Sequence, residues 1–144
     1  MTAARVALPD LVAKWRSEIP IHYRQAGDFF MKLSQVPGLL NRSVTQVLWQ
    51  AALCYEKGGL PEKTQAVLES FIDNWPNDPF LPEALFKLAR MYQVRNRLAR
   101  AEEYYLRLTR EFGRTPFGQQ ALIPLAECYF AEGPAGYKKA EKIL

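Results

Sequence analysis

A nine-residue pattern that recurs every 37 residues constrains the fold of this chain more than any other feature of its sequence. VLWQAALCY at 47–55 aligns with ALFKLARMY at 84–92 and with ALIPLAECY at 121–129. The spacings of 3, 1 and 3 between the matched columns place all four columns on one face of a helix. We therefore predict that the columns are buried and that the chain is an array of stacked helical repeats. The columns are Leu48, Leu85 and Leu122; Ala51, Leu88 and Leu125; Ala52, Ala89 and Ala126; and Tyr55, Tyr92 and Tyr129.

Proline-rich turns mark the expected limits of the repeats. Pro79-Phe80 and Pro116-Phe117 are again 37 residues apart, which gives repeats at 44–79, 80–116 and 117–144, the last of them truncated. AGDFFMKLSQVPG at 26–38 aligns with AEEYYLRLTREFG at 101–113, so 1–43 is predicted to be a degenerate helix pair that caps the array. The predicted fold class is all-α, a right-handed superhelical solenoid of antiparallel helix pairs.

Single residues lead to four local predictions. Pro20 should divide the N-terminal segment into two helices, because proline has no backbone N–H and clashes with the preceding turn. Pro124 should kink the helix expected over 117–131. Asn96 should form the turn between helices at 82–95 and 98–112, and the GPAG sequence at 133–136 indicates a turn before a last helix that begins near Tyr137.

Composition excludes few classes of function. The chain of 144 residues is 49% apolar and 24% charged, which is typical of a globular protein. A net charge of +4 is compatible with an anionic partner but does not require nucleic acid. No apolar run approaches the roughly 18 residues of a membrane span, and no secretory signal is recognisable at the N-terminus. The compartment therefore stays open between bacterial periplasm or cell envelope and cytoplasm.

No constellation of residues predicts catalysis. His22 is the only histidine, and no nucleophile or carboxylate is tied to it by the sequence, so a structural role is favoured. Cys54 and Cys128 share a column two repeats apart, too far for a disulfide, and are expected to be buried apolar side chains. We expect no enzymatic activity, no cofactor and no metal site.

The helix-pair pattern resembles the tetratricopeptide repeat. Its first helix carries a Leu–Leu–small–aromatic column, its second carries alanine and an aromatic residue, and proline stands at the boundary; the usual period of about 34 residues is lengthened here in the turns. NWPNDP at 74–79, followed by PEALFKLA at 82–89, is similar to the "YPNSP…EAL" turns of bacterial envelope proteins such as the Tol-Pal coordinator and the lipoprotein of the outer-membrane assembly machine. The resemblance implies a protein-interaction scaffold, with cell-envelope assembly as its setting.

The resemblance also assigns a binding groove, because the first helix of each pair lines the concave face in this family. The matching positions are Trp49, Leu53, Phe86, Arg90, Ile123 and Glu127. The apolar members among them either contact a bound peptide or pack against a neighbouring repeat, and both interpretations remain open; Arg90 would supply the central charged contact. The carboxylate clamp of chaperone-binding members is not matched, because only Lys87 is basic among the equivalent positions.

Two alternative surfaces are also predicted. A row of arginines lies near one face of the helix at 98–112, where nearby glutamates should offset part of the charge. A solvated, partly ion-paired face is the default interpretation, and a contact for nucleic acid or anionic headgroups is the alternative. Apolar residues at the C-terminal end, Tyr137, Ala140, Ile143 and Leu144, would permit self-association. The arginine row comprises Arg97, Arg100, Arg107, Arg110 and Arg114.

Overall fold

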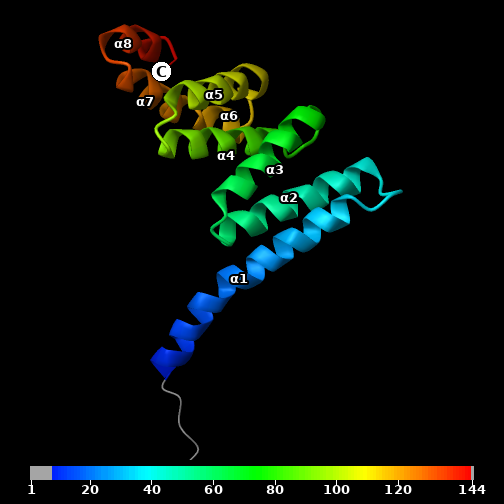
Figure 1. The fold of residues 1–144 in the computed structure, drawn as a ribbon. Helices are drawn as coiled ribbons and strands as arrows, with labels where there is room; N and C mark the ends of the chain where they lie inside the picture. The colour runs from blue at the N-terminus through cyan, green and yellow to red at the C-terminus, as the bar shows by residue number, and fades with distance from the viewer. Residues whose placement is uncertain (1–7, 144) are drawn as a thin grey trace, which may run out of the picture. The chain divides into compact units, whose positions relative to one another are not determined.

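The computed structural model describes residues 8–143, and within that range the only regular secondary structure is α-helix (Figure 1). The chain divides into two compact units, Met1–Val67 and Leu68–Leu144, with the boundary inside one helix. The predicted all-α helical repeat fold is confirmed. The helices are α1 (Leu8–Ser34), α2 (Asn41–Lys57), α3 (Pro61–Asn74), α4 (Leu81–Val94), α5 (Leu98–Phe112), α6 (Pro116–Gln120), α7 (Leu122–Ala131) and α8 (Pro134–Glu141).

The four predicted columns form the interior of both units. Ten of their twelve side chains are buried, and only Leu122 and Tyr92 are half-buried. The alanine column is buried in every repeat, as expected where another helix approaches closely. Among residues 8–143 no helix combines the length and the apolar character that crossing a membrane requires.

The turns between helices use the residues that the sequence indicated. Asn96, between α4 and α5, has a φ of 57°, a left-handed conformation that asparagine tolerates better than most residues. Thr115 precedes α6, and its Oγ1 accepts a hydrogen bond from the N–H of Gly118 at 3.1 Å. These residues explain why the chain reverses direction at the predicted positions.

In the first unit, α1 packs against α2 along its C-terminal half (Figure 1). Gly27 is buried there, and a Cβ atom placed on it would lie 2.6 Å from Cδ1 of Tyr55. A glycine is therefore required at this crossing, because any side chain would displace the tyrosine ring.

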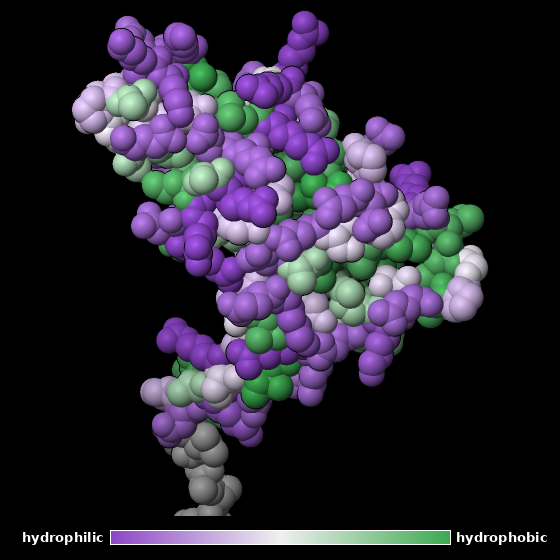
Figure 2. Space-filling model, turned by 45° about the horizontal axis from the view of Figure 1, so that its top comes forward, coloured by the Kyte–Doolittle hydropathy of each residue, from purple (hydrophilic) through white to green (hydrophobic). Residues whose placement is uncertain are grey.

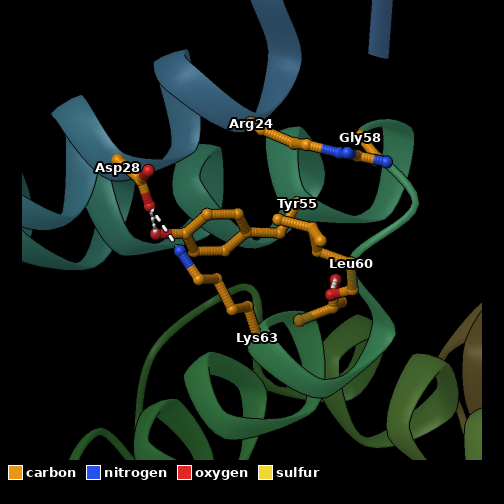
Figure 3. Close-up of polar contacts among 7 residues, drawn as sticks. Arg24, Asp28, Tyr55, Gly58, Leu60 and Lys63 are labelled. Atoms are coloured by element: carbon orange, nitrogen blue, oxygen red, sulfur yellow. Dashed lines mark hydrogen bonds and ion pairs between the residues drawn. The ribbon is translucent and has the colours of Figure 1, made fainter. Parts of the chain in front are cut away.

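Polar contacts around Tyr55 join α1, α2 and the first turn of α3 (Figure 3). The Tyr55 hydroxyl and Lys63 Nζ both donate to Oδ1 of Asp28, each at 2.7 Å, while the Lys63 ammonium lies 5.0 Å from the centre of the Tyr55 ring. Arg24 Nε donates to the carbonyl oxygen of Gly58 at 2.6 Å. Hydrogen bonds from Lys63 and then from Tyr55 lower the pKa of Asp28, so the carboxylate stays charged at neutral pH.

The same arrangement recurs in the second unit. The column tyrosine of α4, Tyr92, donates its hydroxyl proton to the carboxylate of Glu69 on α3, and this bond raises the pKa of Tyr92 to about 12. Tyr129 of α7 bonds to the carboxylate of Glu102 on α5, and burial is the main cause of its raised pKa. Each column tyrosine thus contacts a carboxylate of an earlier helix with its hydroxyl, while its ring is buried in two repeats and half-buried at Tyr92.

The prediction that the helix breaks at Pro20 is wrong. α1 continues through this proline for 27 residues, so the described part of the N-terminal segment is one helix in place of the predicted pair. Proline removes one backbone hydrogen bond, to the carbonyl of Arg16, but its own φ is compatible with a helix. Arg16 is exposed, so water can satisfy the freed carbonyl. The role of 1–43 as a cap, and the predicted repeat boundaries, stay predictions.

The third repeat departs from expectation in two further places. The helix expected over 117–131 is interrupted at Ala121, between α6 and α7, and does not merely kink at Pro124. The position follows from hydrogen bonding, because Pro124 has no N–H for the carbonyl of Gln120. The last helix begins at Pro134, not near Tyr137, since proline is favoured in the first turn and Gly133 provides a φ of 79° just before it.

Candidate partner-binding surface

Two of the predicted binding residues, Trp49 and Leu53, belong to α2 in the first unit. They lie one helical turn apart, and Leu53 is half-buried. Trp49 is only 4% exposed, so most of its indole surface is already covered within the chain. Their role in binding a partner stays a prediction, and the burial of Trp49 shows that it also serves packing.

The other four residues belong to the second unit, where aromatic rings hold part of the surface in place. Phe86 of α4 lies edge-on to Tyr105 of α5, with ring centroids 6.1 Å apart, and contacts Phe117 of α6 at 5.9 Å. The Tyr105 hydroxyl donates to Oε1 of Gln93 at 2.8 Å, and Nε2 of Gln93 donates to Oε2 of Glu127 at 2.9 Å. A chain of contacts therefore connects α5, α4 and α7.

Arg90 and Glu127 both act electrostatically on the Tyr105 hydroxyl. Burial is the main cause that raises the pKa of Tyr105; Cys128 and Glu127 raise it further, and Arg90 opposes the rise. Tyr105 therefore remains a neutral donor near two opposite charges. Phe86, Arg90 and Glu127, which the family resemblance assigned to the groove, thus lie around one buried tyrosine.

Arg90 is the exposed cation of this surface. Its guanidinium forms no ion pair with a carboxylate of residues 8–143, and its side chain is open to solvent. An exposed arginine without an internal carboxylate can form bidentate hydrogen bonds with a carboxylate from outside the chain.

Apolar side chains of α7 lie on either side of Glu127. Ile123 is 65% exposed, and Phe130 is exposed with its ring 5.7 Å from the ring of Tyr137 on α8. The spacing of 4 and 3 residues puts Ile123, Glu127 and Phe130 on one helix face. This face offers apolar area and one negative charge to a partner.

Tyr105 lies buried beneath this surface, and sequence reasoning did not assign it to the site. A tyrosine at a buried position carries a hydroxyl that must find a partner, and that requirement was the available signal. The sequence could not identify Gln93 as the acceptor.

The arginine row is partly ion-paired, in line with its default interpretation. Arg100 pairs with Glu103 at 3.2 Å and Arg107 with Glu111 at 3.1 Å, and both pairs are largely exposed. The other three arginines are exposed and form no ion pair within the described residues; Arg97 and Arg114 stand just outside the bounds of α5. A role of this row in binding anions stays a prediction.

The other features considered from the sequence are a metal site, the two cysteines and the apolar C-terminal end. The part of the chain that the structure describes holds no group of three or more histidine, cysteine or acidic side chains that could bind a metal. Cys54 and Cys128 are free and buried, as predicted. At the C-terminal end Tyr137 is exposed, Ile143 is half-buried, and Ala140 is buried, contrary to the expectation that it is uncovered. Leu144 lies outside the described residues.

Comparison with known proteins shows where the repeat likeness lies. The sequence profile of the tetratricopeptide repeat matches residues 46–78 and 83–115, a little under half of the chain. These two segments are therefore similar to the tetratricopeptide repeat, a unit that generally mediates protein–protein interaction.

Solved structures agree on the fold. Two structures from Podosopora anserina, described as "kinesin light chain nearly identical TPR-like repeats", superpose with TM-scores of 0.63 and 0.62 at 18% and 19% identity. Each alignment covers 90% of this chain and 71% of the other chain. At this identity the likeness concerns the fold alone. No curated protein matches the chain.

Proposed function

We propose that the protein is a non-enzymatic scaffold that holds a peptide or partner protein on the surface formed by Phe86, Arg90, Ile123 and Glu127. The observation that carries the proposal is the exposed guanidinium of Arg90, which has no carboxylate partner among the described residues. The 65% exposure of Ile123 supports it, because a large apolar side chain that is exposed to water gains most from being covered.

The chemistry of the surface indicates the kind of peptide that would bind. A carboxylate of the peptide would form hydrogen bonds with Arg90, and an apolar side chain would cover Ile123. Glu127 would repel a second acidic group, so we expect a segment with one acidic residue near apolar ones. Because Phe86 is already fixed against Tyr105 and Phe117, its side chain would lose little conformational entropy on binding.

Trp49 and Leu53 belong to the first unit, and we propose a contact of these two residues with a partner separately. Trp49→Ala would remove core packing along with any contact to a partner, so it does not separate the two roles. Leu53→Ala is the better test, because Leu53 is half-buried and its truncation should destabilise the fold less than that of Trp49.

The test is affinity capture from a lysate of the source organism, with native bait beside an Arg90→Glu/Ile123→Ser bait. Circular dichroism should show equal helix content in both baits. A matched control carries Arg110→Glu, which reverses the charge of an exposed arginine on α5. A partner that the native and Arg110→Glu baits retain and the double variant loses would support the surface.

Retention of the same partners by all three baits would contradict the proposal. Loss only with Arg110→Glu, together with a steep decline of binding as salt rises, would assign binding to the arginine row and to an anionic ligand.

For the cellular setting we propose assembly at a bacterial cell envelope. Support comes from the turn at 74–79 and the segment at 82–89, which are similar to envelope tetratricopeptide proteins. Fractionation of cells that express the native gene provides the test, and recovery of the protein in the cytoplasm alone would refute the setting.

A further inference from the structure

The unbroken course of α1 gives its sequence a property that a helix pair divided at Pro20 would not have. Over the whole helix, side chains recur at alternating intervals of four and three residues, and seven of these eight positions are apolar. This is the a/d pattern of a coiled coil, sustained for more than three heptads. The positions, called here the α1 seam, are Leu8, Val12, Trp15, Ile19, His22, Ala26, Phe29 and Leu33.

The α1 seam is largely uncovered. Its largest side chains are exposed: Leu8 by 72%, Trp15 by 58%, Ile19 by 50% and Phe29 by 63%. Figure 2 shows hydrophobic side chains on the surface of the part of α1 that adjoins the grey atoms. The contacts to α2 use another side of the helix, where Gly27 meets Tyr55 about 100° around the axis from Ala26. The seam is therefore an apolar stripe, interrupted only by His22, and most of its large side chains remain uncovered by the described residues 8–143.

We propose that the α1 seam binds a second copy of this chain in antiparallel orientation. Glu18 and Lys32 flank the seam on one side, because Glu18 directly precedes the seam residue Ile19 and Lys32 directly precedes the seam residue Leu33. We place residue 24 of each copy at the centre of the antiparallel pair. Glu18 of each copy then lies beside Lys32 of the other copy, which gives two contacts between opposite charges. Glu18 is available for this, because its pair with Lys14 is long, at 3.9 Å, and exposed.

The layers of the seam favour the same orientation. Antiparallel pairing sets Trp15 against Leu33, Ile19 against Phe29 and His22 against Ala26 of the second copy, so each aromatic ring faces an aliphatic side chain. Parallel pairing would instead set His22 against His22 and leave Glu18 opposite Tyr23. Two α1 helices centred in this way overlap over residues 14–34, which extends for about 30 Å and brings six of the eight positions into contact, whereas Leu8 and Val12 lie beyond the overlap.

The first test measures mass by light scattering and sedimentation over a wide concentration range, with the full chain. Native protein is expected to be a dimer that dissociates on dilution. Ile19→Asp places a charge in the seam and should leave a monomer, whereas Ile21→Asp, at an exposed isoleucine on the opposite face, should still dimerise. A native chain that is monomeric throughout, or equal behaviour of the two variants, would overturn the proposal.

A second test uses surface charges, which do not endanger folding. Glu18→Lys should weaken the dimer by setting like charges together, and Glu18→Lys/Lys32→Glu should restore it. Failure of the double variant to recover would exclude the antiparallel contact.

Thiol cross-linking determines the orientation independently. Gln25→Cys should join two copies through a short bis-maleimide, because residue 25 faces itself near the antiparallel centre. Glu18→Cys should not, since its two copies would lie about 21 Å apart along the axis. The native chain, whose cysteines are buried, serves as the control. Cross-linking through residue 18 in preference to 25 would show parallel pairing and refute the antiparallel dimer. Since neither Arg90 nor Ile123 takes part, these results are independent of the proposed function.

Discussion

Gly27 and Asp28, neighbours on α1, determine how this helix is held against α2. Gly27 allows the approach, because its missing side chain leaves room for the Tyr55 ring. Asp28 then accepts hydrogen bonds from Tyr55 and Lys63, so one carboxylate holds groups from two other helices. Neither role is visible in the repeat columns, which record only the tyrosine.

We expect Gly27→Ala to destabilise the first unit by about 1–3 kcal/mol, the usual cost of overpacking a filled interior. The added Cβ atom would meet the Tyr55 ring at 2.6 Å, and this cost should exceed the gain in helix propensity. Urea unfolding followed by circular dichroism provides the measurement. Gln25→Ala, at an exposed position of the same helix, should change the free energy of unfolding by less than about 0.5 kcal/mol. Equal effects of the two substitutions would contradict the steric argument.

Asp28→Asn should destabilise the protein at neutral pH and lose that effect in acid. The folded pKa of Asp28 is lowered, so the carboxylate contributes stability above its unfolded pKa of about 3.9, and this contribution is lost as pH falls through the folded value. The free-energy difference between native protein and variant should therefore be constant above about pH 5 and diminish toward about pH 2. Urea unfolding at a series of pH values measures it. A difference that is the same at both extremes would show that the charge of Asp28 is irrelevant.

At the scale of whole elements, Pro20 and Pro124 act differently, and in the opposite sense to what the sequence predicted. Pro20 lies within a continuous helix, whereas Pro124 follows an interruption at Ala121. The difference depends on what else fixes each segment. Gly118, in α6, lies so close to the carbonyl of Phe112 that a Cβ atom would be 2.0 Å from that oxygen, which fixes the start of the third repeat. No comparable constraint acts on the exposed residues around Pro20.

Replacement of Pro20 by alanine should strengthen α1 locally. The new N–H can donate to the carbonyl of Arg16, and alanine is favoured over proline by up to about 3 kcal/mol in a helix interior. Hydrogen exchange followed by mass spectrometry should show slower exchange of amides near residues 16–24, with unchanged exchange in α5. Faster exchange near residue 20 would indicate that α1 is not continuous in solution.

For the molecule as a whole, the repeat columns predicted the interior because apolar periodicity is a local property of the sequence. The ends of α1, α6 and α8 were less predictable, because they depend on whether the neighbourhood tolerates a proline. The binding role of the candidate surface stays a prediction. The family resemblance supplied Phe86 and Arg90, whereas the bridge from Tyr105 through Gln93 joins residues whose contact no spacing rule specifies. No spacing rule specifies which carboxylate contacts each column tyrosine either.

The two cysteines should report separately on the opening of the two units. Burial raises the pKa of the Cys128 thiol to about 11 and also raises that of Cys54, so little of the reactive thiolate is present near neutral pH. In native protein we expect both to react slowly with iodoacetamide, and Cys54, which is slightly more exposed, to react first. Peptide mapping of alkylation against urea concentration measures both. Rapid labelling of Cys128 in native conditions would contradict its burial.

The bonds between column tyrosines and carboxylates also limit how a cell could regulate this protein. A phosphoryl group on Tyr55 or Tyr92 would place nearly two negative charges where the hydroxyl now contacts Asp28 or Glu69. The added charge would repel that carboxylate and weaken the contact between the helices. Because each hydroxyl is engaged in this contact, a tyrosine kinase should act on these positions more readily while the helices are apart, and the modification would favour their separation. Phosphorylation at the column tyrosines would thus report and preserve an unfolded repeat, whereas Tyr137, which is exposed, could be modified in the folded protein.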